Sequence, residues 1–137
     1  MIRLVVYKDM YFPLVDTKKN TMVARVASYY VFKERHLDFE KLHALVSHEF
    51  GGRTSPRLKR FLHSYVKKLE AYGLVEVYEE NGEKMIVAKA FALPIRWMLH
   101  GVLNDPTVRR KVSKRTLQAW RRGERKPDLG KLLEVVT

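Results

Sequence analysis

The chain has 137 residues, the length of one ordinary domain or of two small ones. Apolar residues make up 46% of it, enough for a packed interior, which argues against a chain that is disordered throughout. Lysine and arginine number 27 against 15 acidic residues, and this net charge of +12 favours a polyanionic partner, nucleic acid first and an anionic membrane second.

The composition also argues against several classes of protein. No apolar run approaches the roughly 18 residues that cross a bilayer, and the first residues lack the pattern of a secretion signal. Because the chain has no cysteine, we expect no disulfides and no thiolate chemistry, and we expect a cytoplasmic, intracellular protein. Asn and Gln are scarce in a chain that is 31% charged, a bias typical of thermophile proteins.

Two short β-strands are expected at the start of the chain. Residues 2–7 and 11–15 are rich in β-branched and aromatic side chains, and Lys8–Met10 can form the turn of a hairpin. Pro13 has no backbone N–H, which predicts that the second strand is short or lies at a sheet edge.

Two helices are expected next. The first begins near Thr21 and ends near His36, and the second follows Asp38 as its N-cap and stops at Gly51. The first helix carries an aromatic set that we expect in the core or in a dimer contact: Tyr29, Tyr30 and Phe32.

The third helix has the clearest boundaries. Thr54 or Ser55 can cap it, Pro56 suits its first position, and Gly73 suits the left-handed residue past its end. One face forms an apolar stripe of Leu58, Phe61, Leu62, Tyr65, Val66, Leu69 and Tyr72. The other face is basic and polar, with Arg57, Arg60, Ser64 and Lys67, and with Lys59, His63 and Lys68 beside them.

A β-hairpin is expected after the third helix. Residues 74–78 and 85–90 read as strands, and Asn81-Gly82 between them is a strong signal for a tight turn. The tip, Glu79 to Lys84, is net acidic.

Helix, helix, basic helix and hairpin follow one another in the order of a winged helix-turn-helix. Residues 20–91 therefore resemble that DNA-binding superfamily. The resemblance implies that the helix at 56–72 lies in a DNA major groove and that the hairpin tip contacts backbone or minor groove. The acidic tip departs from this pattern, because phosphate repels its carboxylates. The tip either stays off the DNA or contacts a protein partner.

Further helices are expected toward the C-terminus. Residues 93–103 have helical spacing, and Ser113 can cap a helix over Lys114–Arg122 that stops at Gly123, followed by a last helix from Asp128. The middle one of these is expected to bury Thr116, Leu117 and Trp120 and to expose Lys114, Arg115, Gln118, Arg121 and Arg122.

Residues 112–136 resemble the second half of a Cro or lambda-repressor-type helix-turn-helix. The shared features are the Val-Ser start, the Thr-Leu pair, the Trp three residues on, and then Gly123, Arg125, Pro127 and the Leu-rich final segment. The resemblance implies that Lys114, Arg115 and Gln118 approach base edges, while Arg122 and Arg125 contact phosphate. Lys111 stands where the family has a glycine in its turn.

The sequence thus predicts a mainly α protein with a small antiparallel β component (α+β). A winged-helix DNA-binding domain with an N-terminal hairpin spans residues 1–91. A helical segment at 92–137, too short to bury a core alone, is expected to pack on it. The residues predicted to contact DNA are Arg53, Ser55, Arg57, Lys59, Arg60, Ser64, Lys67, Lys114, Arg115, Gln118, Arg121, Arg122 and Arg125.

The function predicted is sequence-specific binding of double-stranded DNA by a transcriptional regulator. The alternatives are a sequence-tolerant replication, partition or packaging factor, and a protein-interaction module that docks a partner at its acidic hairpin. A membrane-surface protein ranks last. Homodimerisation is a hypothesis that rests on the N-terminal strands and the aromatic-rich first helix. Neither an enzyme nor a bound cofactor or metal is predicted, since His43 and His48 do not share a helix face and no catalytic triad stands out.

Overall fold

The computed structural model describes residues 2–53, 55–94, 110, 113–122 and 124 of the chain. The chain divides into two compact units, Met1–Leu93 and Pro94–Thr137. Several predictions fall outside the described residues. These are the helix expected at 93–103, except for its first two positions, the stop at Gly123, Arg125, and the last helix from Asp128.

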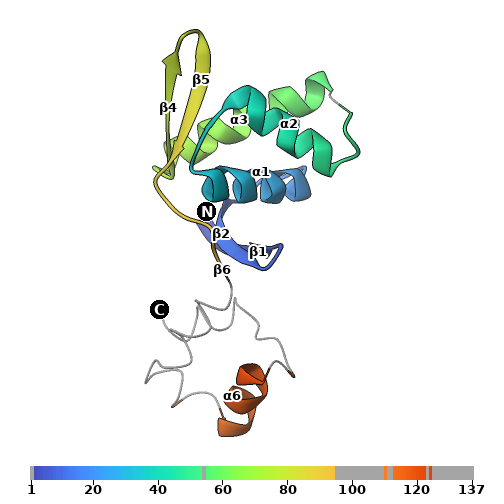
Figure 1. Ribbon diagram of the computed structural model, residues 1–137, viewed down its shortest axis with the longest axis vertical. Helices are drawn as coiled ribbons and strands as arrows, with labels where there is room; N and C mark the ends of the chain where they lie inside the picture. The colour runs from blue at the N-terminus through green and yellow to red at the C-terminus, as the bar shows by residue number, and fades with distance from the viewer. Residues whose placement is uncertain (1, 54, 95–109, 111–112, 123, 125–137) are drawn as a thin grey trace. The chain divides into compact units, whose positions relative to one another are not determined.

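The N-terminal hairpin is confirmed. Strands β1 (Ile2–Tyr7) and β2 (Met10–Val15) pair antiparallel, and Lys8 and Asp9 form the turn with φ of 49° and 59° (Figure 1). The two-residue strand β6 (Leu93–Pro94) joins this sheet, whose order is β1-β2-β6.

Pro13 predicted a strand that is short or at a sheet edge, and the edge alternative is wrong because β2 is the middle strand of its sheet. Pairs alternate along an antiparallel ladder, and Tyr7–Met10 closes the turn as a hydrogen-bonded pair. The pair Leu4–Pro13 then falls on a position without ladder hydrogen bonds, so pairing with β1 does not need an N–H from the proline.

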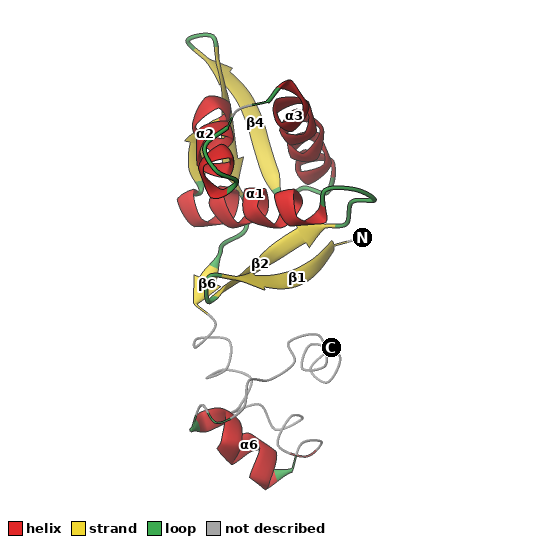
Figure 2. Cartoon of the chain, turned by 90° about the vertical axis from the view of Figure 1, so that its right-hand side faces the viewer, coloured by secondary structure: helices red, strands yellow, loops and turns green. Residues whose placement is uncertain are grey.

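Three helices and a second sheet complete the first unit. The helices are α1 (Thr21–Glu34), α2 (Phe39–Glu49) and α3 (Pro56–Ala71). The strands are β3 (His36–Asp38), β4 (Val75–Glu80) and β5 (Glu83–Ala88), in the order β3-β5-β4. The molecule is therefore an α+β protein, as predicted. In Figures 1 and 2, α1 lies between the β1–β2 hairpin and the α2–α3 pair.

Strand β3 was not predicted. The first helix ends two residues earlier than expected because Arg35 takes a left-handed φ of 68°. His36–Asp38 then pairs with Met85–Val87 of β5. A three-residue strand carries too little periodicity to be seen in the sequence.

The predicted helix boundaries of α2 and α3 are confirmed by their caps. The Asp38 carboxylate accepts from Lys41 N at 2.7 Å, and the Ser55 hydroxyl accepts from Leu58 N at 3.0 Å. Pro56 begins α3, and Gly73 follows it with φ of 74°.

The core lies between α1, the β1–β2 hairpin, the inner faces of α2 and α3, and the β3-β5-β4 sheet, which contributes Leu37, Val75, Ile86 and Ala88. Its largest fully buried side chains include Phe12, Phe32, Leu42, Leu62 and Tyr65. The aromatic set of the first helix belongs to this core, since Tyr29, Tyr30 and Phe32 are only 5%, 8% and 1% exposed.

The Tyr65 hydroxyl joins three elements. It lies on α3, accepts from the backbone N–H of Val15 on β2 at 3.2 Å, and is 2.6 Å from the Ser28 hydroxyl of α1. Val15 is two residues beyond Pro13, so its N–H also points away from β1 and needs this acceptor. The hydroxyl thereby fixes the position of α3 against the rest of the core.

Glu49, at the end of α2, holds the turn of the N-terminal hairpin. Its carboxylate accepts from the Tyr7 hydroxyl at 3.0 Å, and it also contacts the Lys8 ammonium and the Tyr30 hydroxyl. The bonds from Lys8 and then Tyr30 lower the pKa of Glu49 to about 2, while burial and the bond to Glu49 raise the pKa of Tyr30 to about 12.

Replacing Tyr65 by Phe should lower the free energy of unfolding by about 1–3 kcal/mol, because the variant leaves the buried Val15 N–H and the Ser28 hydroxyl without their partner. Denaturant unfolding measures this loss. Tyr11→Phe is the matched control, since the Tyr11 hydroxyl forms no hydrogen bond to any other described residue. Equal stability of the two variants would contradict the role given to the Tyr65 hydroxyl.

Candidate nucleic-acid interface

One face of α3 is basic and exposed. The opposite face is buried, since it carries Leu62, Val66 and Leu69. The burial of these side chains determines which residues of α3 point outward. The exposed face carries the predicted side chains Arg57, Arg60, Ser64 and Lys67, together with Lys68. The prediction of a helix with one core face and one cationic face is confirmed.

The cations of this face lack acidic partners. Among the described residues, Arg53, Arg57, Arg60, Lys67 and Lys68 form no ion pair with a carboxylate, whereas Lys41, Lys59 and Lys89, for example, each do. Arg60 donates only a weak bond to the carbonyl of Pro56, at 3.4 Å. The exposed face of α3 therefore carries a row of cations without acidic partners among the described residues, although Lys18, Lys19, Arg25, Lys33 and Arg35 elsewhere in the first unit form no ion pair with a described carboxylate either.

Three of the residues predicted to contact DNA lie outside the exposed basic face of α3: Lys59, Ser55 and Arg53. Lys59 is on the side of α3 that faces α2, where it pairs with Glu40 at 2.9 Å. The Ser55 hydroxyl already caps α3, although its proton remains available to a phosphate oxygen. Arg53 is exposed in the loop before α3, and no acidic residue stands in the first turn of that helix.

The β4–β5 hairpin is attached to α3 through a stack that the sequence did not reveal. The ring of His63 lies flat on Phe39, with centroids 3.7 Å apart, and Lys84 donates to His63 Nδ1 at 3.1 Å. Lys84 also lies over the Phe39 ring. Burial, followed by the positive charge of Lys67, lowers the pKa of Lys84.

The tip of this hairpin remains acidic in the folded protein. Glu79, Glu80 and Glu83 are exposed, while Lys84, which the sequence places beside them, is half-buried against His63. The turn forms at Asn81-Gly82 as predicted, with φ of 53° and 80°. The hairpin is thus attached to α3 through Lys84, while its tip exposes the carboxylates of Glu79, Glu80 and Glu83.

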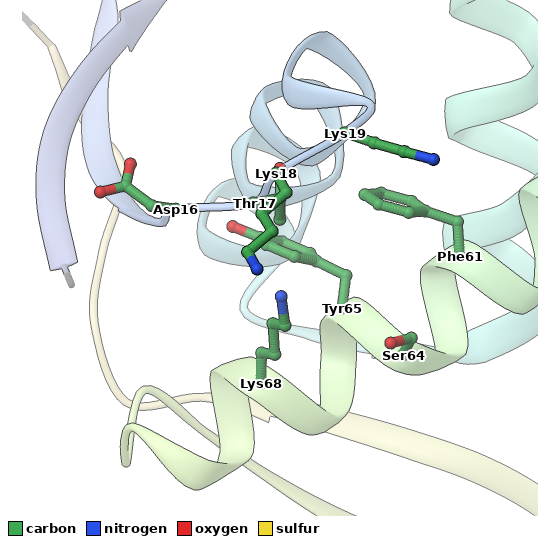
Figure 3. Close-up of a pocket in the computed structure, with 8 residues that line it drawn as sticks. All are labelled: Asp16, Thr17, Lys18, Lys19, Phe61, Ser64, Tyr65 and Lys68. Carbon is green, nitrogen blue, oxygen red and sulfur yellow. The ribbon is translucent and has the colours of Figure 1, made fainter.

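A second basic segment, missed in the sequence, lies beside α3. Lys18 and Lys19, in the loop between β2 and α1, line a cavity of about 560 Å³ together with Phe61, Ser64 and Lys68 (Figure 3). This loop is distant from α3 in the chain, and it joins two elements, β2 and α1, that both contact Tyr65 of α3.

The helix predicted in the second unit is confirmed as α6 (Lys114–Arg121). The Ser113 hydroxyl accepts from Thr116 N at 3.2 Å, and Leu117 is 6% exposed, both as expected. Lys114, Arg115 and Gln118 are exposed, and Arg122 lies 3.9 Å from Glu124. The side chains of Trp120 and Arg121 lie outside the described residues.

Comparison with models of protein families, with characterised proteins and with solved structures gave no match to this chain. Within the described part of the chain, no helix has the length and apolar character needed to span a membrane. The same residues hold no cluster of His, Asp and Glu suited to a metal ion.

The pKa of His63 should lie below its ordinary value of 6.5, because burial and then the ammonium of Lys84 disfavour the imidazolium. His63 then binds a proton more readily in the unfolded chain than in the folded chain. The contribution of neutral His63 to the free energy of unfolding is therefore complete above pH 6.5, and it is lost as the pH falls through the lower pKa of His63 in the folded protein. Lys84→Met should raise the pKa of His63, which an NMR titration of the imidazole measures. An unchanged or lower value in the variant would show that Lys84 does not act on His63.

Proposed function

We propose that this chain is a winged helix-turn-helix protein that binds double-stranded DNA in a sequence-specific manner through α3 and acts as a transcriptional regulator. The order of elements supports the fold. After α1, the helices α2 and α3 and the β4–β5 hairpin follow in sequence, and β3 adds a third strand to the hairpin.

The observation that carries the functional proposal is the row of cations without acidic partners on α3. A folded protein usually disperses or pairs such charges, because like charges repel one another. Here Arg57, Arg60, Lys67 and Lys68 share one exposed face of a single sixteen-residue helix. A helix fits the major groove of DNA, and each lysine or arginine that meets a phosphate releases counterions.

Position along α3 assigns different roles to these residues. Arg57 and Arg60 lie in the first turns, the part of a recognition helix that contacts base edges, and arginine can bind guanine through two hydrogen bonds. Lys67 and Lys68 lie further along, where they suit the phosphate backbone. In the second unit, α6 exposes Lys114, Arg115 and Gln118 on its own first turns, and we propose it as a second DNA contact.

A specific observation favours one alternative function. The exposed carboxylates of the β4–β5 tip, together with the exposed Tyr78, form a surface that suits a basic protein partner rather than DNA. In that function α3 would bind no duplex. The sequence-tolerant alternative keeps α3 on the DNA but assigns all of its contacts to phosphates.

Homodimerisation stays a hypothesis, and it now rests on the N-terminal strands without the aromatic residues of α1. The aromatic residues of α1 are buried in the chain's own core, so they do not supply a dimer surface. The outer edge of β1 is the remaining candidate, because β1 lies at the end of its sheet and Ile2 is 42% exposed.

Arg57→Ala and Arg60→Ala should each weaken binding to the preferred duplex by about 1–3 kcal/mol and relax sequence preference at the position read. Lys67→Ala should weaken all duplexes alike. The preferred duplex is first selected from a randomised pool near physiological salt, and fluorescence anisotropy then gives the affinities. Lys41→Ala, which removes an exposed cation from α2, is the control.

The outcomes separate the three functions. If the arginine variants weaken every duplex equally, the protein binds DNA without reading bases, as in the sequence-tolerant alternative. If the wild-type chain binds no duplex, the DNA-binding proposal is wrong, and the acidic tip becomes the interface to test.

A further inference from the structure

We infer that the phosphate backbone of bound DNA lies in a groove between α3 and the loop of residues 16–20, and that the acidic β4–β5 tip stays off the duplex. This inference rests on the proposed function, since it adds to the DNA-binding surface of α3 a contact with the phosphate backbone of the DNA.

The groove consists of two adjoining cavities that share Lys19 and Phe61. One, of about 560 Å³, extends along α3 to Lys68. The other, of about 580 Å³, reaches back to Arg53 and Arg57 at the start of the helix. We call the two together the basic groove. It follows one side of α3 over most of the length of that helix, and the chain's own loop forms its far wall.

The cations of the basic groove have no counter-charge among the described residues. Figure 3 shows Lys18 and Lys68 extending from opposite walls toward the same space, with Lys19 directed over Phe61. Of the described side chains that line the two cavities, Asp16 alone is a carboxylate, and it turns outward to Arg3, with Oδ1 2.7 Å from Arg3 Nε. An anion in the groove would therefore meet ammonium groups with which Asp16 forms no ion pair.

The α3 wall also offers a hydroxyl group, because Ser64 lines the cavity and is exposed. Hydroxyl and ammonium donors are the groups that bind phosphate oxygens in protein–DNA contacts. The rings of Phe61 and Tyr65 line the same cavity.

The arrangement of charge favours a DNA strand over a single small phosphate. The cations Arg53, Arg57, Lys19, Lys18 and Lys68 are spread along the groove rather than gathered around one point. A row of cations matches a row of phosphates. The β4–β5 tip offers the opposite charge, so a duplex seated on α3 gains by contacting the loop and loses by contacting the tip.

The test uses the full chain and a labelled duplex of mixed sequence, with anisotropy titrations over a range of salt concentrations. The double variant Lys18→Ala/Lys19→Ala should reduce the magnitude of the slope of log K against log salt by about 1.8, which is about 0.9 for each phosphate that is no longer neutralised. Lys41→Ala/Lys89→Ala removes the same charge from other surfaces and should leave the slope near the wild-type value.

A separate arm addresses free phosphate. Inorganic phosphate replaces chloride at constant ionic strength, and NMR follows the backbone amides of the isotope-labelled chain without DNA. If phosphate shifts the amides of Lys18 and Lys19 while the double variant keeps the wild-type salt slope, the groove binds free phosphate and the backbone assignment is overturned.

The remaining outcomes distinguish this inference from the proposed function. If Lys18→Ala/Lys19→Ala behaves like its control while Arg57→Ala weakens binding, α3 binds DNA but the groove does not, and this inference fails alone. If the wild-type chain has no duplex affinity, the proposed function and the groove fail together. A thermal unfolding midpoint near that of the wild type shows that the variants are folded.

Discussion

The Tyr65 hydroxyl is the contact on which the arrangement of the first unit depends. It is almost completely buried, and it satisfies the backbone of β2 and the Ser28 hydroxyl of α1 from a position on α3. An unpaired polar group at this depth would be costly, so these two bonds favour the observed arrangement of the three elements. Glu49 performs a similar task at the other end of the hairpin, where it accepts from Tyr7, Lys8 and Tyr30.

The position of α3 decides where the protein's charge lies. Once Leu62, Tyr65, Val66 and Leu69 are buried, helix geometry leaves Arg57, Arg60, Lys67 and Lys68 on one outward face. The same hydroxyl joins the end of β2 and the middle of α1 to α3, and the loop between β2 and α1 places Lys18 and Lys19 at the edge of that face. The acidic hairpin is attached on the other side, through His63, Phe39 and Lys84. The result is a surface with a positive helix, a positive loop and a negative tip.

Local signals made most of the first unit predictable. Ser55, Pro56 and Gly73 mark the ends of α3, and the apolar stripe between them identifies its buried face. The features that were missed depend on contacts between distant segments. Strand β3 exists because β5 pairs with it, and Lys18 and Lys19 reach α3 only through the fold. Likewise, Lys84 reads as part of the tip in the sequence, whereas the structure half-buries it against His63.

We propose that duplex DNA binds to the face made by α3 and the 16–20 loop. Titrating the isotope-labelled chain with its selected duplex and following the backbone amides by NMR tests this most directly. The largest shifts are expected at Arg53–Lys68 and at Lys18 and Lys19, with the amides of Glu79–Glu83 little changed. The largest shifts at the β4–β5 tip, or no shifts along α3, would contradict it.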